Sequence, residues 1–452
     1  MNIIVVGCGN VGYKIVEHLS SENEHNITVV DTKNETVQDI VNRYDIMGVV
    51  GSGSRIDILI EAGIKNADLL IAVANSDELN LLTCLIAKKL GDCQTIARVR
   101  KPEYSKQVHI FKEDLGLALI INPEQTAATE IARLLRFPTA IQIDTFAKGR
   151  VEILKFRVNP DSVLCNMKIK DMRTRLNCDV LVCGAERKEE TFIPGGNFVI
   201  EEGDLLSIVG APANVSYFFK KIGIKTNHVK DTLIVGGGDT AFYLAKILLR
   251  DGINVKIVEE QISRCEELSE LLPKATIIHG DGTDNEVLLE EGLSNCESFV
   301  SLTNSDEENV LLSLFAMSKT NGKTITKIHR TAYDNVISNL NLDTVINPKN
   351  ITAEYIVRFV RAMNNSIGSN IETMHLILDG KAEALEFRIR EGSPVEGKTI
   401  ESLSLKSNVL IACIARPGEV ITPGGKDVIK NGDTVIVVTT NKGFNDISDI
   451  LR

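Results

Sequence analysis

Residues 2–12 read Asn2-Ile3-Ile4-Val5-Val6-Gly7-Cys8-Gly9-Asn10-Val11-Gly12, and this stretch decides the fold of the first part of the chain. The run 2–6 is rich in β-branched residues and predicts a buried strand. From Val11 to Leu19 the apolar residues recur with helical spacing, which predicts a helix directly after the glycines. Glycines spaced G-x-G-x-x-G between a strand and a helix are typical of a βαβ unit that binds a dinucleotide.

Each glycine of this turn has a physical role in such a unit. The first makes the tight turn, the second lets a pyrophosphate approach the backbone, and the third packs the helix on the strand. The N–H groups at the start of the helix, and its dipole, favour the phosphate charge. The alternative is an ordinary structural turn. The predicted binding residues are Gly7, Cys8, Gly9, Asn10, Val11 and Gly12.

An acidic residue ends the next predicted strand. Residues 27–30 are Ile-Thr-Val-Val, and Asp31 follows them, nineteen residues after Gly12. A carboxylate at this distance accepts hydrogen bonds from the ribose hydroxyls and repels a 2′-phosphate. Asp31 therefore favours NAD or an adenosine nucleotide over NADP, the alternative being a solvated carboxylate at a strand end.

The chain repeats itself at a spacing of 229 residues. Gly7-Cys8-Gly9-Asn10 returns as Gly236-Gly237-Gly238-Asp239, and Asn75-Ser76-Asp77-Glu78 returns as Asn304-Ser305-Asp306-Glu307. Pro194-Gly195-Gly196 likewise returns as Pro423-Gly424-Gly425, and Gly203-Asp204 returns as Gly432-Asp433. A repeat of this length fixes the architecture before any single motif is interpreted.

Each half begins with alternating strand and helix patterns and ends with a shorter, strand-rich segment. We therefore predict an α/β fold with two Rossmann-like doubly wound parallel sheets, each followed by a small strand-rich α+β subdomain. The predicted domains are residues 1–138, 139–228, 229–363 and 364–452.

The second turn departs from the first in two ways. Ala241 replaces the third glycine, which the pattern tolerates, and Asp239 adds negative charge beside the phosphate position. Glu259 is the predicted ribose ligand, with Glu260 as the alternative. The predicted second site comprises Gly236, Gly237, Gly238, Asp239, Thr240 and Glu259.

Two further strands end where a ligand of a doubly wound sheet would lie. The apolar run 69–75 predicts a buried strand whose last residues, Val73, Ala74 and Asn75, line the nucleotide. In the predicted strand 95–100, alternation places Arg98 and Arg100 on one face. Arg98 is the candidate phosphate contact, the alternative being a surface cation, and Lys327 preserves the charge in the repeat.

Composition excludes several classes of function. The net charge of −11 and the lack of a basic stripe argue against a nucleic-acid partner. The strand pattern from residue 2 leaves no room for a signal peptide, and no apolar run reaches the ~18 residues that cross a bilayer. Nine cysteines without C-x-x-C spacing and seven histidines without ligand spacing predict neither a disulfide nor a metal site. We also predict no catalytic residue, because no acid–base or nucleophile arrangement is evident.

Taken together, the glycine turn, Asp31, the Asn75–Glu78 motif, Arg98 and the Pro-Gly-Gly and Gly-Asp segments, all occurring twice, resemble one known family. It is the peripheral subunit of the Trk potassium-uptake system, built from two RCK modules (regulators of potassium conductance). The resemblance covers residues 1–450. In that family the larger subdomain of each module binds NAD(H), ATP or ADP.

The resemblance implies a regulator rather than an enzyme, with NAD or NADH, or ATP or ADP, as its ligand. It assigns Gly7 to Val11, Asp31, Val73, Ala74 and Arg98 to the first nucleotide, and Gly236 to Thr240 with Glu259 to the second. It also implies a cytoplasmic ring of identical chains on the inner face of the membrane, under a potassium-translocating partner.

Two further predictions concern helices and rival functions. Segments 123–137 and 348–362 each open with proline and carry matching apolar stripes, so they suit linker helices between modules or ordinary domain-closing helices.

The rival functions are an NAD-dependent oxidoreductase and a nucleotide sensor for a different effector. The oxidoreductase would need an acid or base beside the nicotinamide, and the sequence offers no such constellation.

Overall fold

A computed structural model of the chain describes residues 1–20, 25–101, 104, 115–136, 140–188, 190–224, 229–330, 337, 340, 342–365, 371–378, 380–444 and 446–452. The chain forms two compact units, and each unit collects segments from both halves of the repeat. Residues 1–132 and 229–357 form the first unit, and residues 133–228 and 358–452 form the second. The predicted boundaries at 138, 139 and 228 lie outside the described residues, so the fourfold division stays a prediction.

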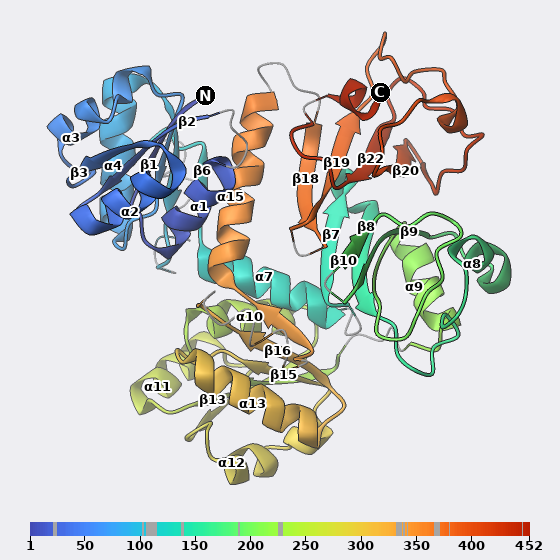
Figure 1. Ribbon diagram of the computed structural model, residues 1–452. Helices are drawn as coiled ribbons and strands as arrows, with labels where there is room; N and C mark the ends of the chain where they lie inside the picture. Colours follow the sequence, from blue (N-terminus) through green and yellow to red (C-terminus); the bar gives the residue numbers. More distant parts are fainter. Residues whose placement is uncertain are drawn as a thin grey trace. The chain divides into compact units, whose positions relative to one another are not determined.

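The first half of unit 1 is a six-stranded parallel sheet in the order β3-β2-β1-β4-β5-β6, with helices on both faces (Figure 1, blue). The order reverses between β1 and β4, which is the switch point of a doubly wound fold. The strands are β1 Asn2–Val6, β2 Asn26–Asp31, β3 Met47–Val50, β4 Leu69–Ala72, β5 Gln94–Arg98 and β6 Leu119–Ile121. The helices are α1 Asn10–Ser20, α2 Asn34–Tyr44, α3 Ile56–Glu61, α4 Asp77–Gly91 and α7 Pro123–Arg136, of which residues 133–136 belong to unit 2.

The second half of unit 1 repeats this sheet in the order β14-β13-β12-β15-β16-β17. The predicted pair of Rossmann-like sheets is thereby confirmed. Its strands are β12 Asp231–Val235, β13 Asn254–Glu259, β14 Thr276–His279, β15 Ser298–Ser301, β16 Lys323–Lys327 and β17 Thr344–Ile346. Its helices are α10 Asp239–Arg250, α11 Ile262–Leu271, α12 Asn285–Glu290, α13 Asp306–Lys319 and α15 Pro348–Asn365, of which residues 358–365 belong to unit 2.

Two strands are shorter than their sequence patterns predict. β4 ends at Ala72 and β5 ends at Arg98, so residues 73–75 and Arg100 lie beyond the sheet. The alternation that placed Arg98 and Arg100 on one face of a strand does not apply, because the backbone of Arg100 bonds to the Asp77 carboxylate instead. The apolar run continues past β4 because Val73 is buried against the glycine turn rather than within the sheet.

Unit 2 contains two antiparallel sheets, as the strand-rich segments predict. Their orders are β10-β9-β11-β8-β7 and β18-β19-β22-β20-β21. The first has β7 Gln142–Phe146, β8 Val151–Arg157, β9 Leu181–Arg187, β10 Glu190–Phe192 and β11 Leu205–Gly210, with helices α8 Ile169–Leu176 and α9 Pro212–Lys221. The second has β18 Ile371–Ile377, β19 Ala382–Arg388, β20 Val409–Arg416, β21 Glu419–Ile421 and β22 Thr434–Thr439.

One apolar core joins the two sheets of unit 2. It contains Phe146 and Cys183 from the first half together with Leu378 and Cys413 from the second. The halves approach closely, since a Cβ added at Gly184 would lie 2.8 Å from the side chain of Leu378. The two strand-rich segments therefore fold as one unit.

The repeated Gly-Asp pair closes a loop in each of these sheets. Arg187 donates from Nε and Nη2 to the two carboxylate oxygens of Asp204, both at 2.7 Å. Arg416 holds Asp433 in the same way, at 2.8 and 3.0 Å. Charge-assisted bidentate pairs of this kind fix loop geometry, so these repeated residues are structural. No helix among the described residues is long and apolar enough to cross a lipid bilayer.

Candidate nucleotide sites

The first glycine turn requires glycine at two positions. Gly7 has a left-handed φ of +93°, and a Cβ on it would lie 2.5 Å from the Ala74 nitrogen. A Cβ on Gly12 would lie 2.0 Å from the Gly7 carbonyl oxygen. A Cβ on Gly9, in contrast, would meet nothing within 4 Å. The turn is thus tightly packed at Gly7 and Gly12 and open at Gly9, where a pyrophosphate would approach.

Asp31 is fixed beside this turn by two backbone N–H groups. Cys8 donates to its Oδ2 at 2.7 Å, and Lys33 donates to its Oδ1 at 2.9 Å. These bonds hold the carboxylate at the end of β2, next to the start of α1. Burial, and then the charge of Asp31, raise the pKa of the Cys8 thiol to about 12, so the thiol stays protonated at neutral pH and is a poor nucleophile.

The second half reproduces this geometry. Gly236 has a φ of +95°, and Gly237 donates to Oε2 of Glu259 at 2.7 Å. The other carboxylate oxygen of Glu259 accepts from the Gln261 nitrogen at 2.8 Å. The structure therefore places Glu259, rather than Glu260, in the position that corresponds to Asp31.

A buried cation lies at the end of β5 and of β16. Arg98 is 7% exposed and donates from Nη2 to the Ala74 carbonyl at 2.8 Å. Burial, and then the charge of Arg100, lower the pKa of Arg98. Its counterpart Lys327 donates from Nζ to the Leu302 carbonyl at 2.8 Å. Because these cations are buried, the interpretation of Arg98 as a surface cation was wrong.

A buried asparagine, Asn80, organises the end of β4. The amide of Asn80 accepts from the Ala74 nitrogen at 2.8 Å and donates to the carbonyls of Ala74 and Arg98, at 3.0 and 2.9 Å. Asn309 makes the same three bonds in the second half. Its equal place in both halves was the signal that could have identified it. Asn80 thereby links the backbone at Ala74, after β4, to the backbone at Arg98, at the end of β5.

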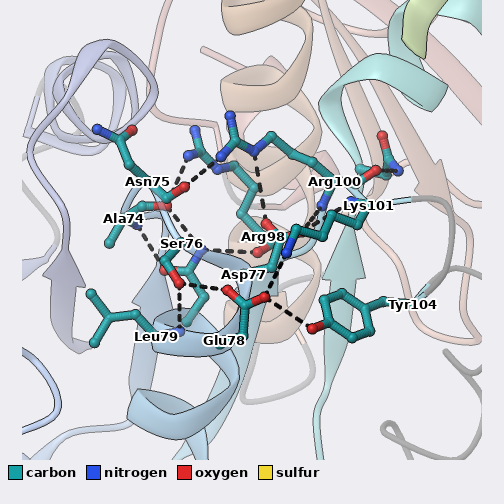
Figure 2. Close-up of polar contacts among 12 residues, drawn as sticks. Ala74, Asn75, Ser76, Asp77, Glu78, Leu79, Arg98, Arg100, Lys101 and Tyr104 are labelled. Atoms are coloured by element: carbon teal, nitrogen blue, oxygen red, sulfur yellow. Dashed lines mark hydrogen bonds and ion pairs between the residues drawn. The ribbon is translucent and has the colours of Figure 1, made fainter. Parts of the chain in front are cut away.

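The repeated Asn75-Ser76-Asp77-Glu78 motif connects the segment after β4 to the segment after β5 (Figure 2). Ser76 caps α4 by accepting from the Leu79 nitrogen at 3.2 Å. Asp77 accepts from the nitrogens of Arg100 and Lys101, both at 2.9 Å, and Arg100 also donates to the Asn75 carbonyl. Hydrogen bonds from Lys101, Ser76 and Tyr104 lower the pKa of Glu78. Ser76 and Asp77 therefore support the site, and the binding of the nucleotide by Asn75 stays a prediction.

The residues of the first half suit an adenine dinucleotide or a related nucleotide. The open position at Gly9 and the start of α1 would hold the phosphates, and Asp31 would accept the ribose hydroxyls. Nε of Arg98 is buried without a hydrogen-bond partner among the described residues, and a phosphate oxygen would satisfy it. Val11 and Val73 are buried against the turn and shape it, whereas Asn75 is exposed. The described residues contain no cluster of His, Cys, Asp or Glu that could hold a metal ion.

Comparison with known proteins agrees with the fold and the repeat. The TrkA-N domain family matches residues 3–123 and 232–348, and the TrkA-C domain family matches residues 153–223 and 384–452. Among solved structures, the GsuK channel has a TM-score of 0.63 at 17% identity, over 98% of this chain and 77% of the channel. The GsuK channel bound to NAD has a TM-score of 0.62 at 18% identity, over 97% and 77%. The fold is therefore that of tandem RCK modules.

Curated relatives match along the whole chain. The Trk system potassium uptake protein TrkA of Halomonas elongata is 32% identical over 98% of this chain and 96% of its own length. The TrkA homolog 1 of Methanosarcina mazei is 30% identical over the full length of both chains. The chain belongs to the TrkA family of Trk potassium-uptake proteins.

Lys327, the counterpart of Arg98 in the second half, leads to a pH prediction. Burial lowers the pKa of Lys327 to about 8, against the opposing charges of Glu124 and Asp306. The ammonium is therefore charged below this pH and neutral above it, and an anionic ligand favours the charged form. Second-site affinity for a nucleotide should thus fall as the pH rises through about 8.

Calorimetric titration at about pH 7 and about pH 9, with the first site disabled by Asp31→Ala, would check this expectation. Lys327→Arg should remove the pH dependence, because an arginine stays charged over this range, as Arg98 does in the first half. An equal loss of affinity in the Lys327→Arg protein would contradict the assignment.

Proposed function

We propose that this chain is the nucleotide-binding regulatory subunit of a Trk-type potassium transporter, and that NAD(H), ATP or ADP at the turns of unit 1 controls uptake. The observation that carries the proposal is the carboxylate held against each turn, by Cys8 N to Asp31 and by Gly237 N to Glu259. Both halves keep this bond although the acid itself differs. Membership of the TrkA family supplies the transporter as the effector.

Regulation requires only a small difference in binding energy. A ligand shifts a conformational equilibrium by its difference in affinity for the two states, and a tenfold shift needs about 1.4 kcal/mol. The contacts of one ribose or one phosphate supply that amount. A nucleotide with equal affinity for the open and closed transporter would have no effect.

Gly9→Asp separates nucleotide binding from folding. A side chain at Gly9 enters open space, so the turn should fold while the new carboxylate repels the phosphates. Cells that lack the gene should regain potassium uptake at limiting potassium with the wild type and lose most of it with Gly9→Asp or Asp31→Ala. Uptake would be measured as the initial rate of potassium accumulation.

Two variants serve as controls for this experiment. Gly9→Asn places the same bulk where the pyrophosphate would approach but adds no charge, so it should reduce uptake less than Gly9→Asp does. Gly238→Asp tests the second turn, where a Cβ also meets nothing within 4 Å. If uptake does not depend on the gene, or if Gly9→Asp matches the wild type while its nucleotide binding is lost, the proposed function is wrong.

We also propose that copies of this chain assemble through α4 and α13, on the inner face of the membrane beside the transporter. Leu82 on α4 is 46% exposed, and Leu311 at the corresponding position of α13 is 67% exposed. Large apolar side chains exposed at matching positions favour a symmetric interface between copies. Leu82→Lys with Leu311→Lys should reduce the mass measured by light scattering, whereas Leu289→Lys, an exposed leucine on α12, should not. An unchanged mass in the double variant would rule out this interface.

A further inference from the structure

The two turns differ in charge at one pair of positions. Asp239 is the first residue of α10, where the first half has Asn10 as the first residue of α1. On the helix after the ribose acid, the second half has Arg264 in α11 and the first half has Thr36 in α2. An ion pair in one half therefore replaces two neutral side chains in the other.

The hydrogen bonds to the acid establish that Arg264 and Thr36 correspond. Lys33 donates its backbone N–H to Asp31, and Gln261 donates its own to Glu259. Thr36 lies three residues after Lys33, and Arg264 lies three residues after Gln261. Both therefore lie in the first turn of their helices.

Arg264 is bonded directly to the second glycine turn. Its Nε donates to the Gly237 carbonyl at 2.8 Å, and its Nη2 donates to Oδ1 of Asp239 at 3.1 Å. Its Nη1 donates to Glu267 at 2.6 Å. The guanidinium thus lies between the ribose acid Glu259, which Gly237 also contacts, and the start of α10, where phosphates would bind.

Asp239 makes this position unfavourable for an anion unless it is neutralised. Its carboxylate lies at the helix end where the backbone N–H groups would receive a phosphate. Arg264 balances that charge through the ion pair. A phosphate that approaches Arg264 competes with Asp239 for the charge of the same guanidinium. The charge of the ligand therefore decides whether Arg264 moves from Asp239 to the ligand.

We propose that Arg264 exchanges Asp239 for a phosphate of the bound nucleotide, and that the second site thereby selects nucleotides with a terminal phosphate over dinucleotides. A bridging phosphate of NAD carries one negative charge, the same as the carboxylate, so the exchange gains little. A terminal phosphate carries about −1.5 to −2 and has three acceptor oxygens, so the exchange is favourable. The first site, with Asn10 and Thr36, has no such requirement. This inference rests on the proposed function.

Calorimetric titrations of the full chain with ADP and with NAD test the assignment. The Asp31→Ala background disables the first site, so that the second is measured alone. There, ADP should bind about tenfold more tightly than NAD, the difference expected from one charge-assisted contact. Arg264→Thr should remove most of this preference by weakening ADP, and Asp239→Asn should strengthen ADP because Arg264 is then free of its partner. Glu267→Gln, which alters only the third contact of Arg264, should leave the preference unchanged.

A reciprocal variant tests the idea at the first turn. Asn10→Asp with Thr36→Arg, in a Glu259→Ala background, should transfer the preference for ADP to the first site. Retention of the ADP preference in Arg264→Thr, together with no preference in the reciprocal variant, would overturn the inference and leave the proposed function standing. Failure of the wild type to bind either nucleotide would overturn both.

Discussion

Replacing Lys155 by methionine should lower the free energy of unfolding of unit 2 by about 3–5 kcal/mol. Nζ of Lys155 lies 2.7 Å from Oε1 of Glu186, and both side chains are buried. The two residues come from β8 and β9, which flank β11 in the sheet. Removing the lysine takes the countercharge of this pair away from a buried carboxylate, and that cost exceeds the value of the pair itself. Urea unfolding followed by circular dichroism would measure the loss.

Two controls separate the buried charge from a simple loss of packing. Lys155→Met combined with Glu186→Leu should recover stability to within about 1 kcal/mol of the wild type, because no charge is left buried. Arg173→Met breaks a solvent-exposed pair with Asp179 in the same unit, and should cost less than about 1 kcal/mol. If Lys155→Met cost no more than Arg173→Met, the buried pair would be of little importance.

Gly12→Ala should abolish nucleotide binding at the first turn and destabilise unit 1 by about 1–3 kcal/mol. The new methyl group would lie 2.0 Å from the Gly7 carbonyl oxygen, so the helix and the turn must separate. That movement would displace the backbone N–H groups and the Cys8–Asp31 hydrogen bond on which the site depends. Calorimetric titration and thermal unfolding would report the two effects separately.

The chain provides a matched comparison for this substitution. The second turn already has Ala241 at the equivalent position, where it is fully buried. Ala241→Gly should therefore keep second-site binding and change stability by about 1 kcal/mol or less, the ordinary difference between alanine and glycine in a helix. Equal nucleotide binding at both sites in the Gly12→Ala protein would contradict this prediction. It would show that the first turn accommodates an alanine as the second turn accommodates Ala241.

Local spacing determined much of this protein without the structure. The strand, glycine turn and helix at residues 2–20 follow from side-chain periodicity, which acts over a few residues. The repeat carried that assignment to the second half, and the order of both parallel sheets agrees with it. Asp31 could be identified because a fixed chain length leads from the turn to the end of the next strand.

The sequence was less informative where strands end. The apolar run 69–75 predicts a longer strand than β4, because burial against a turn and burial within a sheet give the same pattern. Asn80 is absent from the predicted site, although it bonds to Ala74 and Arg98, which are 6 and 18 residues away. Such a role depends on which backbone groups the strand ends leave unpaired, and no spacing rule encodes that.

The consequence of a sequence difference between the two halves is also visible only in the tertiary structure. Alignment shows Arg264 and Thr36 only as unlike residues on a helix surface, and the structure shows that Arg264 turns back onto the glycine turn and onto Asp239. The sequence by itself determined the repeated strand–turn–helix units and their acids, because these depend on short, regular spacing. Only the tertiary structure decided which cations are buried, which carboxylates they neutralise and which halves share a core, because these depend on residues distant in the sequence that packing brings together.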